Sequence, residues 1–137
     1  MKREKFLRVV FAVGSLIGIA FIANIVIARG IQEYHVIIPP VGSTTTGRIR
    51  KENHTGAVNN NTSVGSGNRT TMYCAIRVAN TGQDVTPNIR VDSGQRIGIP
   101  YYRVDQVVGH DTTLAVSTHP FVIVHVEAHG SWSPDSN

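Results

Sequence analysis

Hydrophobic residues after position 28 recur mainly at every second position, which is the period of a β-strand. The segment 70–79 is the clearest case, because its apolar positions 72, 74, 76 and 78 share one strand face. Similar short runs predict further strands at 34–38, 44–50, 85–91, 101–108, 112–117 and 121–128. No stretch after residue 28 has the period of an amphipathic helix. The pattern predicts an all-β fold, a single antiparallel β-sandwich over about residues 31–132.

The inward faces of these strands define the expected core. Cys74 is the only cysteine of the chain and cannot form an intrachain disulfide, so its apolar strand face predicts a buried, unreactive thiol. An intermolecular disulfide is the minor alternative. We expect the following side chains to be largely buried: Met72, Cys74, Ile76, Val78, Val104, Val108, Val122, Val124 and Val126.

Residues 53–70 interrupt the strand pattern. Asn, Thr, Ser and Gly dominate this segment, and it has no helical period. The composition predicts a long flexible loop, or a weak hairpin, near 53–70.

The N-terminal segment 1–28 has the pattern of an export signal. Four basic residues, the last of them Arg8, precede an uncharged run from Val9 to Ala28, and small residues stand at the end of that run. We expect cleavage after Ala28, with an uncleaved N-terminal membrane anchor as the alternative. Either way, residues 29–137 form the exported domain, secreted or extracellular, and only residues 9–28 could contact a membrane.

The charge of the exported domain differs from that of the whole chain. The formal net charge of +4 comes largely from the basic residues before position 9, and after Ala28 nine Lys and Arg oppose eight Asp and Glu. The arginines are also spread along the domain and form no basic stripe. Both observations argue against a nucleic-acid partner.

Several short motifs resemble small secreted proteins of Gram-positive bacteria that form a family of unknown function. The matching pieces are Gly47-Arg48-Ile49-Arg50, Tyr101-Tyr102, Thr112-Thr113-Leu114 and the tail from Gly130 to Ser136. The chain departs from the family pattern because it lacks a Trp after the Asn-rich segment and carries His125 and His129 near the tail. The resemblance implies a secreted β-rich domain and implies no activity.

Candidate chemistry concentrates in the segment 121–129. His125, Glu127 and His129 stand at alternate positions and therefore on one face of the predicted strand. Two imidazoles and a carboxylate suit a transition-metal ion such as zinc. The simpler interpretation is the solvated face of an amphipathic strand, and the other histidines, including His35, are expected to be surface residues without a partner. We predict no bound cofactor.

The tail provides a binding candidate, Trp132, and Tyr101 is a second one. We expect Trp132 to lie just past the sheet edge, where it either folds back to plug the sandwich or is an exposed anchor for a partner. Pro134 and the polar end suit a chain that leaves the domain. We favour the plug, because one chain end that closes its own core needs no second molecule, so Trp132→Ala should lower the melting temperature and Asp135→Ala should not.

Two functions remain open. The first is a non-catalytic secreted domain that binds a cell-envelope component or a protein, as a bacteriocin-like or surface factor. The alternative is a small secreted metal-binding protein or enzyme that uses His125, Glu127 and His129. No nucleophile elbow, phosphate loop or metal-finger spacing is present, which favours the non-catalytic interpretation.

Overall fold

The computed structural model describes residues 30–65, 70–118 and 122–136. The predicted signal segment, 1–28, lies outside the described residues, and within these ranges no helix is long and apolar enough to cross a membrane. The elements are β1 (Gln32–Ile38), β2 (Ser43–Thr45), β3 (Ile49–Arg50), β4 (Ala57–Val64), β5 (Thr71–Val78), β6 (Ile89–Asp92), β7 (Arg96–Ile99), the 3₁₀ helix η1 (Val104–Gln106), β8 (Asp111–Ser117) and β9 (Val126–Ser133).

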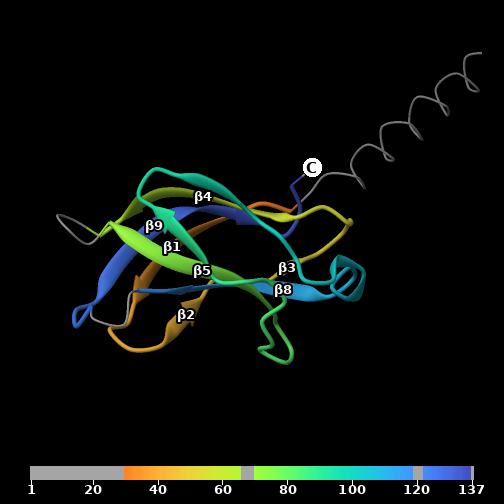
Figure 1. Cartoon of the computed structure of the whole chain (residues 1–137), viewed down its shortest axis with the longest axis horizontal. Coiled ribbons are helices and arrows are strands. Elements are labelled where there is room, and N and C mark those ends of the chain that lie inside the picture. The colour runs from red at the N-terminus through yellow and green to blue at the C-terminus, as the bar shows by residue number, and fades with distance from the viewer. Residues whose placement is uncertain (1–29, 66–69, 119–121, 137) are drawn as a thin grey trace, which may run out of the picture.

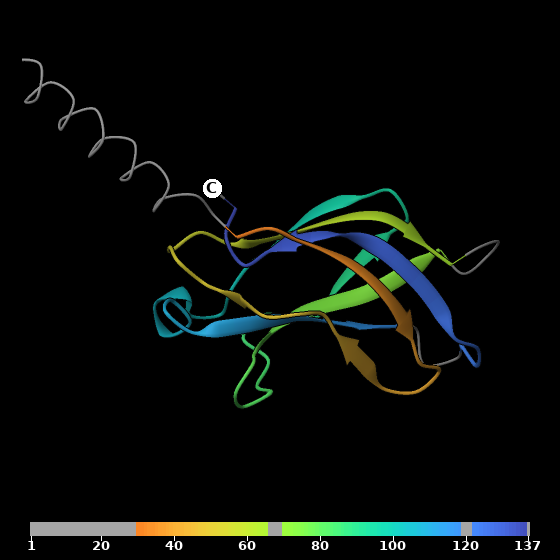
Figure 2. The ribbon, with the colours of Figure 1, turned by 180° about the vertical axis from the view of Figure 1, so that it is seen from behind.

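The strands form two antiparallel sheets that pack as a β-sandwich, which confirms the predicted fold class (Figure 1). One sheet has the order β1-β9-β4-β7, and the other has the order β2-β8-β5-β6, with β3 also paired to β8. The opposite view shows the same two layers, with β1, β9 and β4 in one and β2, β8 and β5 in the other (Figure 2). Neighbouring strands such as β1 and β9 are therefore far apart in the chain, and register alone decides which of their side chains meet.

The core lies between the sheets and draws on both of them. Met72, Cys74 and Ile76 of β5 are fully buried, as predicted, whereas Val78, expected in the core with them, is only partly buried. The three buried side chains belong to one cluster with Trp132 of the other sheet. Burial raises the pKa of the Cys74 thiol to about 11, so little thiolate forms at neutral pH. The prediction of a buried, unreactive thiol is consistent with this position.

The predicted strand 101–108 is wrong. Its central residues form η1, a single helical turn, so alternate residues no longer share a face. Val107 is buried, whereas Val104 and Val108, which the strand pattern placed in the core, are only partly buried. In this turn the Val107 N–H donates a hydrogen bond to the Val104 carbonyl, and the chain then leads into β8.

The predicted loop at 53–70 is also wrong, because residues 57–64 form β4, which lies between β9 and β7. Its buried positions include Asn59 and Asn61, and both side chains hydrogen-bond to Tyr34 of β1. The Tyr34 hydroxyl donates to Asn59 Oδ1 at 2.8 Å, and Asn61 Nδ2 donates to the same hydroxyl at 3.1 Å. A buried polar network thus replaces the apolar face that a strand would normally show in its sequence.

The final strand lies further along the chain than predicted. β9 begins at Val126 rather than Phe121, so Val124, expected in the core, is 37% exposed and Val122 is only partly buried. β9 also continues into the tail as far as Ser133, with Gly130 against the Tyr34 ring. A Cβ atom at position 130 would lie 2.6 Å from the Tyr34 hydroxyl oxygen, so only glycine fits there.

Residues 133–135, at the end of β9 and just after it, are buried in the domain. Asp135 and Lys51 are fully buried, and the Lys51 Nζ lies 2.8 Å from Asp135 Oδ1. Lys51 also donates to the carbonyls of Thr55 at 2.6 Å and Pro134 at 2.9 Å. Its Nζ lies 4.4 Å from the centre of the Tyr101 ring. We call Lys51, Tyr101, Pro134 and Asp135 the C-terminal lock. Its burial corrects the expectation that Pro134 and the polar end leave the domain, and the effect of Asp135→Ala on stability stays a prediction.

Candidate metal centre

Two adjacent strands bring a pair of histidines together on the outer face of the four-stranded sheet. In β1, Tyr34 and Ile38 point inward, so His35 points outward. In β9, Val126 and Ala128 point inward, which leaves Glu127 and His129 on the outer face. The antiparallel register then sets His35 directly opposite His129. We call His35, Glu127 and His129 the histidine–glutamate cluster.

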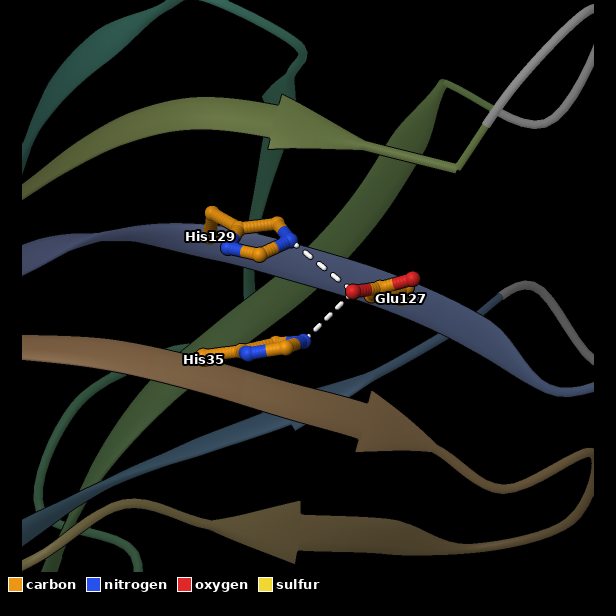
Figure 3. Close-up of side chains that lie close together, drawn as sticks. All are labelled: His35, Glu127 and His129. Atoms are coloured by element: carbon orange, nitrogen blue, oxygen red, sulfur yellow. Dashed lines mark hydrogen bonds and ion pairs between the residues drawn. The ribbon is translucent and has the colours of Figure 1, made fainter.

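Both imidazoles of the cluster point at one carboxylate oxygen (Figure 3). The His35 Nε2 lies 2.5 Å from Glu127 Oε1, and the His129 Nε2 lies 3.0 Å from the same oxygen. The two rings stack with their centroids 4.0 Å apart and their planes 23° from parallel. The three potential ligand atoms all lie within 4.8 Å of one another.

The cluster is accessible from solvent. The side chains of His35, Glu127 and His129 are 58%, 56% and 42% exposed. The hydrogen bonds from His35 and then His129 lower the pKa of the Glu127 carboxyl, with a smaller contribution from the nearby imidazole charges. Glu127 is therefore an anion at neutral pH, and its charge lies where two nitrogen ligands converge.

This arrangement fits a divalent transition-metal ion. Zinc takes imidazole nitrogen and carboxylate oxygen at about 2.0–2.2 Å, which places tetrahedral ligand atoms about 3.3 Å apart. The two nitrogen–oxygen separations are 2.5 and 3.0 Å and all three ligand atoms lie within 4.8 Å of one another, so metal binding requires only small movements of exposed side chains. Three protein ligands would leave one coordination position facing solvent.

The structure changes one member of the set predicted from sequence. Glu127 and His129 are together, as their spacing indicates, but His125 is not with them. His125 precedes the first residue of β9, so the strand alternation that was expected to align it does not reach it. His35, expected to be an isolated surface residue, takes that place from β1. Glu127, to which His35 is hydrogen-bonded, is 92 positions away in the chain, so only the strand register could have revealed the contact.

Tyr101 and Trp132, the predicted binding candidates, are not exposed anchors. Trp132 is 1% exposed and lies within β9, so its indole fills the core as part of the sheet and not as a plug folded back over it. Tyr101 is partly buried, and its hydroxyl donates to the Pro134 carbonyl at 2.8 Å. Burial, with a smaller effect of the Asp135 charge, raises the pKa of Tyr101.

A polar groove of about 580 Å³ borders the histidine–glutamate cluster. His35 and His129 form part of its wall, so a ligand in the groove would lie beside the cluster. Its remaining walls come from β1, β4 and β9 and offer carboxylate, amide and hydroxyl groups: Glu33, Tyr34, Asn60, Thr62, Gly130 and Ser131.

No protein-family model, no curated protein and no solved structure matches this chain. The candidate site therefore rests on its own geometry.

Proposed function

We propose that this chain is an exported, non-catalytic β-sandwich domain that binds a divalent transition-metal ion, zinc foremost, through His35, Glu127 and His129. The observation that carries the proposal is the convergence of three ligand atoms, from two strands, within 4.8 Å on a solvent-facing sheet surface. The proposed export, and the proposed kinship with small secreted proteins of Gram-positive bacteria, rest on the sequence alone.

A binding role suits this site better than catalysis. Metal-dependent catalysis gains from a site that excludes water and surrounds the reacting group. The histidine–glutamate cluster instead lies on the outer face of a sheet, with each of its side chains more than 40% exposed. A surface site of this kind can hold an ion or use it to bridge to another molecule.

Zinc titration of the full-length chain tests the proposal by isothermal calorimetry. We expect one zinc ion per chain, and His35→Ala should weaken its binding at least tenfold. His125→Ala is the matched control, because His125 is exposed, belongs to the same segment of the chain as Glu127 and lies outside the cluster. Equal affinity of the wild type and His35→Ala, or a loss confined to His125→Ala, would contradict the proposed site.

A second candidate function is the binding of a polar cell-envelope component in the groove beside the cluster. The groove supports it through uncharged hydrogen-bonding groups on adjacent strands, Asn60 and Thr62 of β4 and Ser131 of β9. Sedimentation of the protein with purified peptidoglycan provides the test. Asn60→Ala should then reduce the bound fraction, while Asn88→Ala, an exposed asparagine outside the groove, should not. No co-sedimentation of the wild type would rule this ligand out.

A further inference from the structure

The C-terminal lock holds a primary amine against a carboxyl group in surroundings that exclude water. The side chains of Lys51 and Asp135 are both 0% exposed, and Nζ lies 2.8 Å from Oδ1. We propose that Lys51 and Asp135 condense to form an intramolecular amide bond, so that the domain cross-links its own C-terminal end. The proposal is independent of metal binding, since it uses none of the residues of the histidine–glutamate cluster.

The hydrogen bonds around Lys51 orient its nitrogen for attack. An ammonium group has three N–H bonds, and here they match three acceptors: the Thr55 carbonyl at 2.6 Å, the Pro134 carbonyl at 2.9 Å and Asp135 Oδ1. Transfer of the third proton to Asp135 leaves two N–H bonds that the carbonyls still hold. The nitrogen lone pair then points along the former hydrogen bond, toward the carboxyl group.

The backbone around Asp135 supports the developing charge on the carboxyl group. The N–H of Glu52 donates to Oδ2 at 2.9 Å, and the N–H of Asn53 donates to Oδ1 at 3.2 Å. Attack on Cγ moves negative charge onto Oδ2, where the Glu52 N–H already lies. Fixed backbone donors of this kind stabilise tetrahedral intermediates of acyl transfer.

The reaction needs no other reactant. One proton passes from Nζ to Oδ1, the nitrogen lone pair forms a bond to Cγ, and the carbonyl electron pair moves onto Oδ2. The electron pair on Oδ2 then re-forms the carbonyl, the bond between Cγ and Oδ1 breaks, and Oδ1 leaves as water with a second proton from Nζ. One amide and one water replace the amine and the acid. The fixed contact of the two groups removes the entropy cost of bringing them together, which favours the step.

The position of the bond explains what it would do for the fold. Cys74 is the only cysteine, so no intrachain disulfide can form. The Lys51 and Asp135 side chains are 84 positions apart and join the segment before β4 to the residues after β9. A covalent link there would close a long loop, as a disulfide does, at the end of the chain that is otherwise most prone to fray.

Mass spectrometry of the purified full-length chain tests the proposal. We expect the wild type, after prolonged incubation at neutral pH, to be lighter than its sequence by one water molecule. After denaturation, trypsin should no longer cleave behind Lys51. The digest should contain a branched species that joins the peptide 51–69 to the peptide 104–137.

The double variant Lys51→Met/Asp135→Leu is the control, because an apolar pair of similar size can replace a buried ion pair and keep the fold. It should show the same β-type circular dichroism and the full sequence mass. A wild-type mass equal to the sequence would overturn the proposal. So would a water loss in which Lys51 remains cleavable, because that result indicates a succinimide formed at an aspartate.

Discussion

The histidine–glutamate cluster and the C-terminal lock contain similar chemical groups in opposite surroundings. Each brings nitrogen donors to a carboxylate within 3.0 Å. The Lys51 and Asp135 side chains of the lock are fully buried, and protein atoms accept the hydrogen bonds that Lys51 donates. In the cluster, more than 40% of each side chain is exposed. The comparison teaches what burial decides: removal of one member of the buried pair leaves an unpaired charge inside the protein, whereas the exposed trio is available to a ligand.

The comparison predicts its largest effect at Asp135. Asp135→Ala leaves the buried Lys51 ammonium without its charged partner, so the free energy of unfolding should fall by about 3–5 kcal/mol. Urea denaturation followed by circular dichroism measures this loss. Asp105→Ala, at an exposed aspartate in η1, is the control and should change stability by less than about 0.5 kcal/mol. A similarly small effect at Asp135 would mean that the lock does not form.

A second prediction concerns the core position of Trp132. Trp132→Ala removes a side chain that is 1% exposed, so it should lower the free energy of unfolding by about 3–5 kcal/mol. A loss at the upper end of this range would leave the domain barely folded. Trp132→Phe retains an aromatic ring and should cost less. Unchanged thermal denaturation of Trp132→Ala would show that the indole lies outside the core.

A third prediction is that the cluster contributes little to stability. His129→Ala removes a side chain that is 42% exposed, and exposed ion pairs contribute about 0–1 kcal/mol. Its urea midpoint without metal should therefore stay close to that of the wild type. With zinc present, the wild type should gain thermal stability and His129→Ala should not, since only the native wild type binds the ion. A large loss of stability in metal-free His129→Ala would show that the cluster stabilises the fold, as the lock does.

The smallest expected effect is the acid dependence of the cluster. Glu127 has a lowered pKa in the native state, so the unfolded chain binds more protons there as the pH falls. The stability that ionised Glu127 contributes is fully present above the ordinary Glu pKa of about 4.3, and it is lost as the pH falls through the lower pKa of the native state. Thermal melts should thus show the wild type losing slightly more stability than Glu127→Gln between neutral and acidic pH. If Glu127→Gln lost more stability on acidification than the wild type, the pKa of Glu127 could not be lowered in the native state.

The sequence predicted the elements whose pattern is set by their own residues. β5 and β8 alternate regularly or are rich in β-branched residues, and both lie where expected. β4 was missed because its inward positions include Asn59 and Asn61, which are stable there only with Tyr34 of another strand. The end of β9 was missed because Gly130 is a poor strand residue by itself and fits only against Tyr34.

The candidate site was predicted only in part, because one of its residues comes from a different strand. Glu127 and His129 belong to one strand, so their spacing was sufficient to pair them. His35 joins them through the register of β1 with β9, and no local pattern encodes that register. Lys51 and Asp135 were missed for the same reason, since a buried ion pair between distant segments has no signature in either segment.

A crystal structure of the full-length chain with zinc, using the anomalous signal of the metal, tests the central claim most directly. We predict one anomalous peak about 2.0–2.2 Å from the His35 and His129 Nε2 atoms and a Glu127 carboxylate oxygen. The crystal of His35→Ala should lack this peak. A zinc peak at His125, or no peak at the cluster in a zinc-containing crystal of the wild type, would contradict the account.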